Sequence, residues 1–226
     1  MNEHELKAVA SQLAKPTGET GIAVGEKMNQ GNVVMIDASI AALATVAGER
    51  ILEIGPGNGV LSIPIVRALG DSGSYIALEY SEDMAREANK NLSALLPNGV
   101  EIKTGDCLEA DIPEESIDGL LATNVLYFID DIDALFSKCI AWLKPKGRAV
   151  FAVRSSKTMK SLPFTEYGFN IRPVETLMES LSIAGFTNIT AKYIIDDPSK
   201  FVDDTTDNDK PDDPSIGSII ITGLKS

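Results

Sequence analysis

The stretch ILEIGPGNG at residues 51–59 decides the fold. Its first four residues are mostly apolar and predict a short buried strand. The glycines and proline that follow mark a sharp turn. Residues 59–69 then repeat apolar side chains at helical spacing before Gly70, a residue type that commonly ends a helix. The stretch therefore predicts a strand, a glycine-rich turn and a helix in succession.

The alternation of strands and helices continues along the chain. We expect strands at 74–78, 100–104, 119–124 and 148–153, and helices at 81–96, 132–143 and 174–184. Ser81 is a plausible N-cap, and Gly185 ends the last helix. Strands that alternate with helices form a parallel sheet with helices on both faces.

The C-terminal end breaks this alternation. Residues 189–195 and 216–221 are both strand-like, with no helix between them, so they should pair antiparallel. The acidic stretch 196–214 between them predicts a solvated loop. The sequence thus predicts an α/β fold: a Rossmann-like, doubly wound, seven-stranded sheet with a C-terminal antiparallel hairpin and N-terminal helices.

The N-terminal region, residues 4–47, has helical apolar spacing. Helix-breaking residues divide this region into two or three predicted helices. These residues are Pro16, Gly18, Gly21 and Gly25. We expect residues 1–48 to form a helical cap on a main domain at 49–226, as a single folded unit.

Composition excludes several classes of function. The formal charge is −13, which repels nucleic acid and anionic membranes, and no apolar run suits membrane insertion. The N-terminus lacks an apolar signal core, so a cytoplasmic location is expected. The single histidine, His4, argues against a histidine triad or a histidine metal site. Cys107 and Cys139 are too few for a disulfide framework and predict reduced, buried thiols.

The glycine-rich turn favours one kind of ligand. A dinucleotide fingerprint needs glycine at the sixth position from Gly55, where this chain has Val60, and no Gly-Lys-Ser/Thr phosphate loop is present. The acid Glu53 suits a cationic ligand such as the sulfonium and α-amino group of S-adenosylmethionine. A purely structural turn is the open alternative.

Two further acids follow predicted strands. Glu79 ends the second strand, where a carboxylate can accept hydrogen bonds from both hydroxyls of a ribose. Asp106, after the third strand, can accept from an adenine amino group, with Cys107 beside it. Each acid has a simpler alternative, since Glu79 can cap a helix and Asp106 can close a turn.

This order of motifs resembles the class I S-adenosylmethionine-dependent methyltransferases, in their small-molecule branch. The resemblance covers about residues 50–153 and includes the segment EYSEDM at 79–84 with Ala88, similar to the family's acid-x-Ser-x-x-Met-x-x-x-Ala. The run LKPKG at 143–147 resembles its Leu-x-Pro-Gly-Gly turn but has Lys146 in place of a glycine. We expect this departure to alter the turn and leave binding intact.

The resemblance implies that S-adenosylmethionine is the cofactor and S-adenosylhomocysteine the product. It also implies a division of the site into parts that hold methionine, ribose and adenine, with the methionine part next to the substrate. The implied cofactor-binding residues are Glu53, Gly55, Pro56, Gly57, Asn58, Gly59, Glu79, Tyr80, Met84, Asp106, Cys107 and Asn124.

Residues 15–32 are similar to a bacterial subgroup likened to the quinone-biosynthesis methyltransferases, in which N-terminal helices cover the cofactor. Met28 and Asn29 are therefore candidates for the pocket roof, although Met28 also suits core packing. Tyr127 and Phe128 are candidates for an apolar acceptor pocket, with burial as the alternative. Arg154 is a candidate for receiving an anionic substrate group, with a surface role as the alternative.

The chemistry expected is in-line methyl transfer to a small-molecule acceptor, driven by positioning and exclusion of water. The sequence selects no catalytic base. Asp130, Asp131 and Asp133 lie at the start of a predicted helix, where their negative charges suit the positive end of the helix dipole. We expect no metal site there. The alternatives are a non-catalytic S-adenosylmethionine-binding or regulatory protein on the same fold, and a nucleotide-linked oxidoreductase, which Val60 disfavours.

Overall fold

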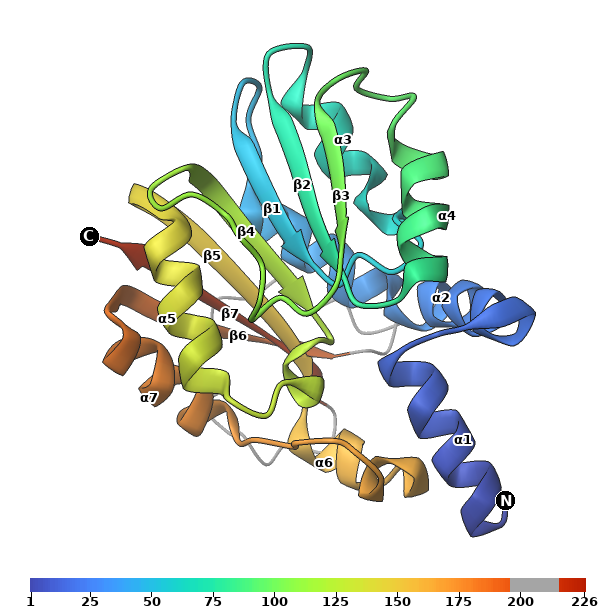
Figure 1. Ribbon diagram of the computed structural model, residues 1–226. Helices are drawn as coiled ribbons and strands as arrows, with labels where there is room; N and C mark the ends of the chain where they lie inside the picture. The colour runs from blue at the N-terminus through green and yellow to red at the C-terminus, as the bar shows by residue number, and fades with distance from the viewer. Residues whose placement is uncertain (196–215) are drawn as a thin grey trace.

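The computed structural model describes residues 1–195 and 216–226. The described residues form one seven-stranded sheet in the order β3-β2-β1-β4-β5-β7-β6 (Figure 1). Its strands are β1 (Arg50–Ile54), β2 (Ser74–Glu79), β3 (Val100–Thr104), β4 (Ile117–Thr123), β5 (Leu143–Arg154), β6 (Phe186–Ile195) and β7 (Ile216–Lys225). Strands β1 to β5 run parallel, while β7 pairs antiparallel with both β5 and β6. The predicted fold class, including its C-terminal hairpin, is confirmed.

The helices lie on both faces of this sheet. They are α1 (Glu3–Ala14), α2 (Gly18–Leu43), α3 (Ile63–Leu69), α4 (Glu82–Leu92), α5 (Ile132–Trp142), α6 (Ser156–Lys160) and α7 (Val174–Ala184), with 3-10 turns η1 (Val60–Ser62), η2 (Leu126–Phe128) and η3 (Pro163–Glu166). In Figure 1, α5 and α7 lie on the near side of the sheet and α3 on the far side, and the two chain ends lie at opposite sides of the molecule. The acidic stretch 196–214 lies outside the described residues.

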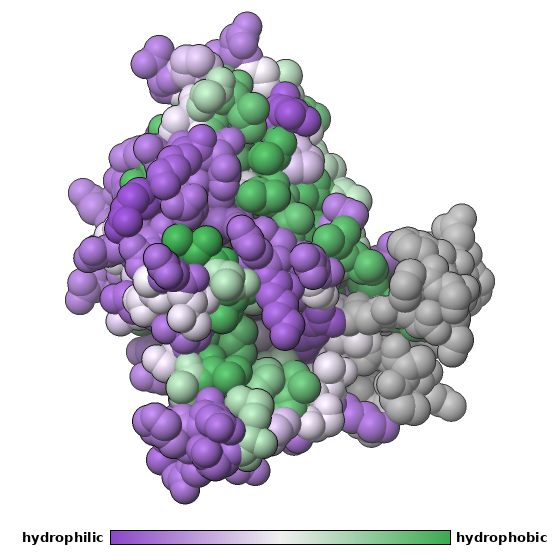
Figure 2. Space-filling model, turned by 90° about the vertical axis from the view of Figure 1, so that its right-hand side faces the viewer, coloured by the Kyte–Doolittle hydropathy of each residue, from purple (hydrophilic) through white to green (hydrophobic). Residues whose placement is uncertain are grey.

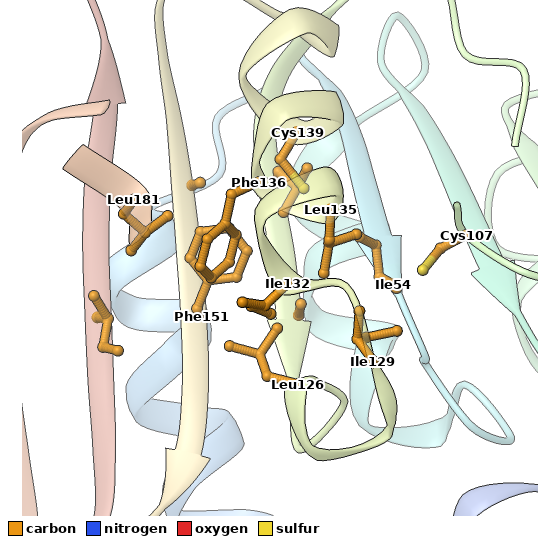
Figure 3. Packing of buried hydrophobic residues seen from close by; sticks show 14 of the residues in the cluster. Ile54, Cys107, Leu126, Ile129, Ile132, Leu135, Phe136, Cys139, Phe151 and Leu181 are labelled. Atoms are coloured by element: carbon orange, nitrogen blue, oxygen red, sulfur yellow. The ribbon is translucent and has the colours of Figure 1, made fainter. Parts of the chain in front are cut away.

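A hydrophobic core fills each side of the sheet. On the side of α5 and α7, Phe136 of α5 packs against Phe151 of β5 with ring centroids 5.0 Å apart (Figure 3). The predicted free thiols Cys107 and Cys139 are both buried on this side. On the other side, α2 contributes Met35 to the core that also holds α3 and part of α4. The sheet therefore sits between two cores, as the alternating sequence pattern predicted.

Helix α2 differs from the prediction. The chain breaks at Pro16, as expected, but Gly21 and Gly25 lie inside a continuous helix of 26 residues. Both glycines are buried because other parts of the chain approach them closely. A Cβ atom on Gly21 would lie 2.6 Å from the carbonyl carbon of Pro16, and one on Gly25 would lie 3.0 Å from Sδ of Met84. These glycines serve close packing and do not end the helix.

Several other element boundaries also differ from the predictions. The predicted helix 59–69 begins with the 3-10 turn η1, and its α-helical part begins only at Ile63, so the glycine turn does not lead directly into an α-helix. Helix α4 ends at Leu92, four residues before the predicted end at Leu96. Strand β5 begins at Leu143, because the 143–147 run joins the sheet with a register shift opposite 117–119. Lys146 there has a φ of 67°.

The face that carries the N-terminal helices is mixed in character. Figure 2 shows hydrophobic residues between hydrophilic ones on this side of the molecule. On α2, Ile22 and Val33 are exposed hydrophobic residues. No helix among the described residues is long and apolar enough to cross a bilayer.

Candidate functional site

A cavity of about 510 Å³ opens at the carboxyl ends of β1, β2, β3 and β4. In a doubly wound sheet this edge is where ligands bind, because the loops that leave the strands diverge there. Residues from α1 and α2 complete the wall, so parts of the chain far apart in sequence enclose one space.

The glycine-rich turn forms the floor of this cavity. Gly55 has a φ of 70°, and a Cβ atom there would lie 2.4 Å from Cγ2 of Val125, so only glycine fits. Gly57 has a φ of 60°, and its Cβ position faces open space. Gly59 does not line the cavity; its Cβ position lies 2.9 Å from Leu92 of α4, so this glycine permits packing of α4 against the turn.

Glu79 lies in the cavity wall at the end of β2. Its Oε2 accepts a hydrogen bond of 2.9 Å from the backbone N–H of Gly57, and its Oε1 accepts one of 2.9 Å from Ser81. No basic side chain pairs with it among the described residues, and burial raises its pKa to about 7. These backbone donors hold the carboxylate in place, and the oxygens retain lone pairs for ligand hydroxyls.

Glu53 is the second buried acid of the wall. Its Oε2 accepts a hydrogen bond of 2.7 Å from the hydroxyl of Tyr75, whose exposed fraction is 0%. Burial raises the pKa of Glu53, although the hydrogen bonds from Tyr75 and Ser62 lower it in part. A buried carboxylate in this position favours a cationic ligand group, which would restore the charged form.

The loop after β3 supplies the two predicted adenine neighbours. Asp106 lines the cavity, and its Oδ1 accepts a hydrogen bond of 2.8 Å from the backbone of Leu108, which also makes it a turn residue. Cys107 lines the cavity as a buried thiol, and burial raises its pKa to about 11. A thiol with so high a pKa stays protonated, so Cys107 acts here as a small apolar group.

Two residues of the 79–84 segment also line the cavity. Tyr80 is 52% exposed, and the Nζ atom of Lys15 lies 4.4 Å from the centre of its ring. Met84 is buried against Gly25 of α2. Between them, Ser81 accepts a hydrogen bond from Met84 N as the predicted N-cap and donates one to the carbonyl of Pro16. This segment therefore joins the α1–α2 connection to the start of α4.

Helix α2 forms the roof through the two residues expected there. Met28 and Asn29 both line the cavity. The Nδ2 atom of Asn29 donates a hydrogen bond of 3.0 Å to Oδ1 of Asn58 in the glycine-rich turn. The roof is thus bonded to the floor.

Asn124 follows β4 in a left-handed conformation with a φ of 57°. Its backbone N–H donates to the carbonyl of Ala152, and its Nδ2 donates 3.0 Å to Oδ1 of Asn32 on α2. Asn124 therefore lines the cavity from strand β4 and is held there from the opposite side.

The three residues expected at the acceptor site differ in their position relative to the cavity. Phe128 lines the cavity, but Tyr127 and Arg154 do not. Tyr127 packs in the core, where burial raises its pKa, and its hydroxyl accepts a hydrogen bond from the backbone N–H of Arg154. Arg154 donates from Nη2 to the carbonyl of Gly31 and to Asn32. Tyr127 and Arg154 therefore stabilise the wall, and Arg154 is not positioned as an anion receptor in the cavity.

Sequence reasoning missed much of the lining from the N-terminal helices. Asn32 was overlooked as a site residue, although its spacing of three from Asn29 and four from Met28 puts all three on one helix face. Further cavity residues outside the predicted set are Leu13, Ala14, Pro16, Ile36, Leu61, Thr123, Ile129 and Gly168. The docking of α1 and α2 brings the first four to the cavity, whereas the others come from η1, the end of β4, the residue after η2 and the loop between η3 and α7.

The electrostatic character of the cavity is acidic. Among the described residues, four carboxylates line it and no lysine, arginine or histidine does; the four are Glu53, Glu79, Asp106 and Asp130. No group of three or more possible metal ligands occurs among the described residues. A ligand that brings hydroxyl donors and positive charge fits these donors and acceptors, whereas a pyrophosphate would meet repulsion. S-adenosylmethionine, with two ribose hydroxyls, a sulfonium and an α-ammonium group, fits this set.

The fold and this cavity define a class: a Rossmann-like α/β protein with an acidic ligand site at the carboxyl edge of its sheet. A family model described as a methyltransferase domain matches residues 51–147. The chain is 28% identical over 151 residues to phosphoethanolamine N-methyltransferase 1 of Arabidopsis thaliana, which covers 64% of this chain and 30% of that protein. The chain therefore spans about a third of that relative's length.

Two further matches cover more of this chain and more of the matched protein. The chain is 24% identical over 181 residues to a demethylmenaquinone methyltransferase of Lactobacillus johnsonii, which covers 79% of this chain and 72% of that one. An S-adenosylmethionine-dependent methyltransferase from Mesorhizobium loti shares the fold, with a TM-score of 0.67 at 18% identity over 84% of this chain and 96% of that chain. Residues 51–147 therefore match a methyltransferase domain, and the chain is similar in sequence and in fold to S-adenosylmethionine-dependent methyltransferases.

Proposed function

We propose that this protein is an enzyme that transfers a methyl group from S-adenosylmethionine to a small-molecule acceptor. The observation that carries the proposal is Glu79, a buried carboxylate fixed by the N–H groups of Gly57 and Ser81 in a cavity without a basic side chain among its described lining residues. This arrangement suits a ribose beside a cationic sulfur. When bound, the cofactor supplies a methyl group activated by its sulfonium.

The chain's own residues contribute binding, orientation and exclusion of water. Glu79 accepts hydrogen bonds from the ribose, the backbone around Gly57 approaches the methionine portion, and Asp106 with Cys107 borders the adenine. Helix α2 closes the cavity from above through Met28 and Asn29. In-line transfer from a sulfonium gains most from such positioning, so the proposal requires no catalytic base from this chain.

The acceptor in this proposal is uncharged and largely apolar. The remaining lining is mostly apolar, from Leu13, Met28, Ile36, Phe128 and Ile129. The plant relative is named for phosphoethanolamine, but a phosphate would find no basic partner among the described lining residues. The bacterial relative is named for demethylmenaquinone, an apolar molecule, and supports the apolar assignment. Nucleic acid is excluded from the proposal because the net charge of −13 opposes it.

The test is a thermal-unfolding titration with S-adenosylmethionine and S-adenosylhomocysteine, with NAD as the control ligand. A ligand at about a hundred times its dissociation constant adds roughly 2.7 kcal/mol of stability. We expect a clear rise in the unfolding temperature with both adenosyl ligands, its loss in Glu79→Ala, and no rise with NAD. Absence of any rise in the wild-type protein would overturn the cofactor assignment.

A screen of acceptors follows binding. Wild-type protein with labelled S-adenosylmethionine should methylate at least one uncharged aromatic or quinol acceptor and leave phosphoethanolamine unmodified. Binding of both adenosyl ligands without transfer to any acceptor would favour a non-catalytic S-adenosylmethionine-binding protein on this fold. The cytoplasmic location stays a prediction.

A further inference from the structure

Two asparagine pairs connect helix α2 to the sheet above the glycine-rich turn. Asn29 of α2 bonds to Asn58 of the turn, and Asn32 of α2 bonds to Asn124 after β4, each at 3.0 Å. All four side chains line the cavity. This group, which we name the asparagine cluster, adds uncharged polar groups to a wall that also carries four acids.

The orientation of two of these amides is fixed by neighbours that can only donate. Arg154 Nη2 lies 3.1 Å from Oδ1 of Asn32, and a guanidinium has no acceptor, so the atom facing it must be the amide oxygen. The backbone N–H of Val60 likewise donates 3.2 Å to Oδ1 of Asn58. The second atom of each amide is therefore the amino group, Nδ2.

These two amino groups have no hydrogen-bond partner among the described residues. Asn58 is only 8% exposed and lines the cavity, yet its Nδ2 is not among the buried side-chain atoms that lack a partner, so this atom keeps some exposed surface. The Nδ2 atom of the half-buried Asn32 on α2 is likewise not among those atoms, and Asn32 also lines the cavity. Two oriented amide donors thus face a cavity in which none of the described lining residues is basic.

We propose that Asn32 and Asn58 bind the α-carboxylate of S-adenosylmethionine through their Nδ2 groups. This inference rests on the proposed function and assigns Asn32, the last residue of the 15–32 segment, as a cofactor-binding residue. The carboxylate is the one anionic group of that cofactor, and the described cavity offers it neutral amide donors in place of a guanidinium or ammonium. The asparagine cluster lies between the glycine-rich turn and the end of β4, next to the expected methionine portion.

The cluster also assigns a role to Arg154. Arg154 fixes the amide of Asn32, Asn32 accepts from Asn124, and Asn124 lies 3.4 Å from the hydroxyl of Tyr127. Arg154 is then a positioning residue, because it sets which atom of Asn32 faces the ligand without contacting the ligand.

The test compares two ligands in calorimetric titrations at about pH 8, above the pKa of Glu79. S-adenosylhomocysteine carries the α-carboxylate, whereas 5′-methylthioadenosine lacks the whole amino-acid portion. The variant Asn32→Asp keeps an oxygen for Asn124 and Arg154 but replaces the Nδ2 donor with a second acceptor oxygen and adds a negative charge. The variant Asn58→Asp does the same at the second position, and the exposed Asn89→Asp on α4 controls for the added charge.

We expect Asn32→Asp and Asn58→Asp each to weaken S-adenosylhomocysteine binding by about 10- to 100-fold and to leave methylthioadenosine binding unchanged. Asn89→Asp should bind both ligands as the wild type does. The ratio of the two affinities within each variant cancels any general loss of folded protein.

Two results would overturn the assignment. An equal change for both ligands means that Asn32 and Asn58 only support the wall, and tighter binding of S-adenosylhomocysteine means that they face the α-ammonium group. Failure of the wild-type protein to bind S-adenosylhomocysteine would instead refute the proposed function itself, so the two failures are distinguishable.

Discussion

At the scale of single residues, Glu79 links pH to ligand binding. Its pKa is raised to about 7 mainly by burial, while ribose hydroxyls need the ionised carboxylate as acceptor. We expect the dissociation constant for S-adenosylhomocysteine to rise by up to about tenfold per pH unit as the pH falls below about 7, and to stay constant above it. Calorimetric titrations between about pH 5.5 and 8 measure this dependence.

The control for this prediction is Glu79→Gln, which should bind weakly and with no pH dependence in that range. The stability of the ligand-free protein changes with pH in the opposite direction to ligand binding. Because the native pKa of Glu79 lies above its ordinary value of 4.5, its contribution to stability is present below about pH 4.5 and is lost as the pH rises to about 7. A wild-type affinity that is constant from about pH 5.5 to 8 would contradict the assigned role of Glu79.

Two neighbouring glycines separate folding from binding. Gly55→Ala brings Cβ within 2.4 Å of Val125 at a positive φ, so we expect a loss of about 2–4 kcal/mol in the free energy of unfolding. Gly57→Ala meets open space at the cavity and should cost only about 1 kcal/mol in stability while weakening S-adenosylhomocysteine binding. Urea unfolding and ligand titration of both variants measure this; equal stability losses would contradict it.

At the scale of elements, Ser81 holds two helical segments together. Its hydroxyl caps α4 at Met84 and donates to the carbonyl of Pro16 between α1 and α2. Ser81→Ala should therefore destabilise the protein by about 1–3 kcal/mol and also weaken ligand binding, since Pro16 lines the cavity. Denaturant unfolding and ligand titration report the two effects.

The matched control is Asp131→Ala, which removes the N-cap of α5 at Ala134 on a residue outside the cavity lining. It should cost about 1 kcal/mol and leave binding unchanged. If the two variants behave alike in the ligand titration, the hydrogen bond between Ser81 and Pro16 has no part in forming the site.

At the scale of the whole molecule, α2 belongs to the core of the sheet. Met35 of α2 is 1% exposed and packs in the core with residues of β1 and α3, so a boundary at residue 48 does not separate the packing. We expect Met35→Ala to lower the free energy of unfolding by about 2–5 kcal/mol in one cooperative transition. Fluorescence and circular dichroism, followed together in urea, test this.

The exposed neighbour Val33, which is 41% exposed on the same helix, provides the control. Val33→Ala should change stability by less than about 0.5 kcal/mol. If Met35→Ala instead unfolds the N-terminal helices in a separate early transition and leaves the sheet transition unchanged, residues 1–48 form an independent cap.

Much of the fold could be predicted because its signals are local. Alternating strand and helix patterns, the N-cap Ser81 and the terminal Gly185 each act within a few residues of the chain. The prediction was wrong for Gly21 and Gly25, because their helix-breaking tendency is outweighed by close contacts with Pro16 and Met84. Those contacts involve residues distant in sequence, or a turn geometry that no propensity encodes.

The residues of the candidate site also divide into those that local sequence predicts and those that it does not. Glu53, Gly55, Gly57 and Glu79 line the cavity as expected, because each lies at or just after the carboxyl end of a strand, a position that the topology fixes. Tyr127 and Arg154 do not line it, because Tyr127 packs in the core and Arg154 is bonded to Gly31 and Asn32 of α2. Asn32 lines the cavity because α2 docks over the turn.

The sequence by itself determined the order of strands and helices, the glycine-rich turn and the acids at or just after the carboxyl ends of β1, β2 and β3. Those features depend on periodicity and on backbone conformations that only certain residues adopt. Only the tertiary structure decided which face of α2 covers the turn and which amide atom of Asn32 and Asn58 lacks a partner among the described residues. It also decided that no basic side chain among the described residues lines the cavity. These depend on contacts between segments tens of residues apart, which local sequence does not constrain.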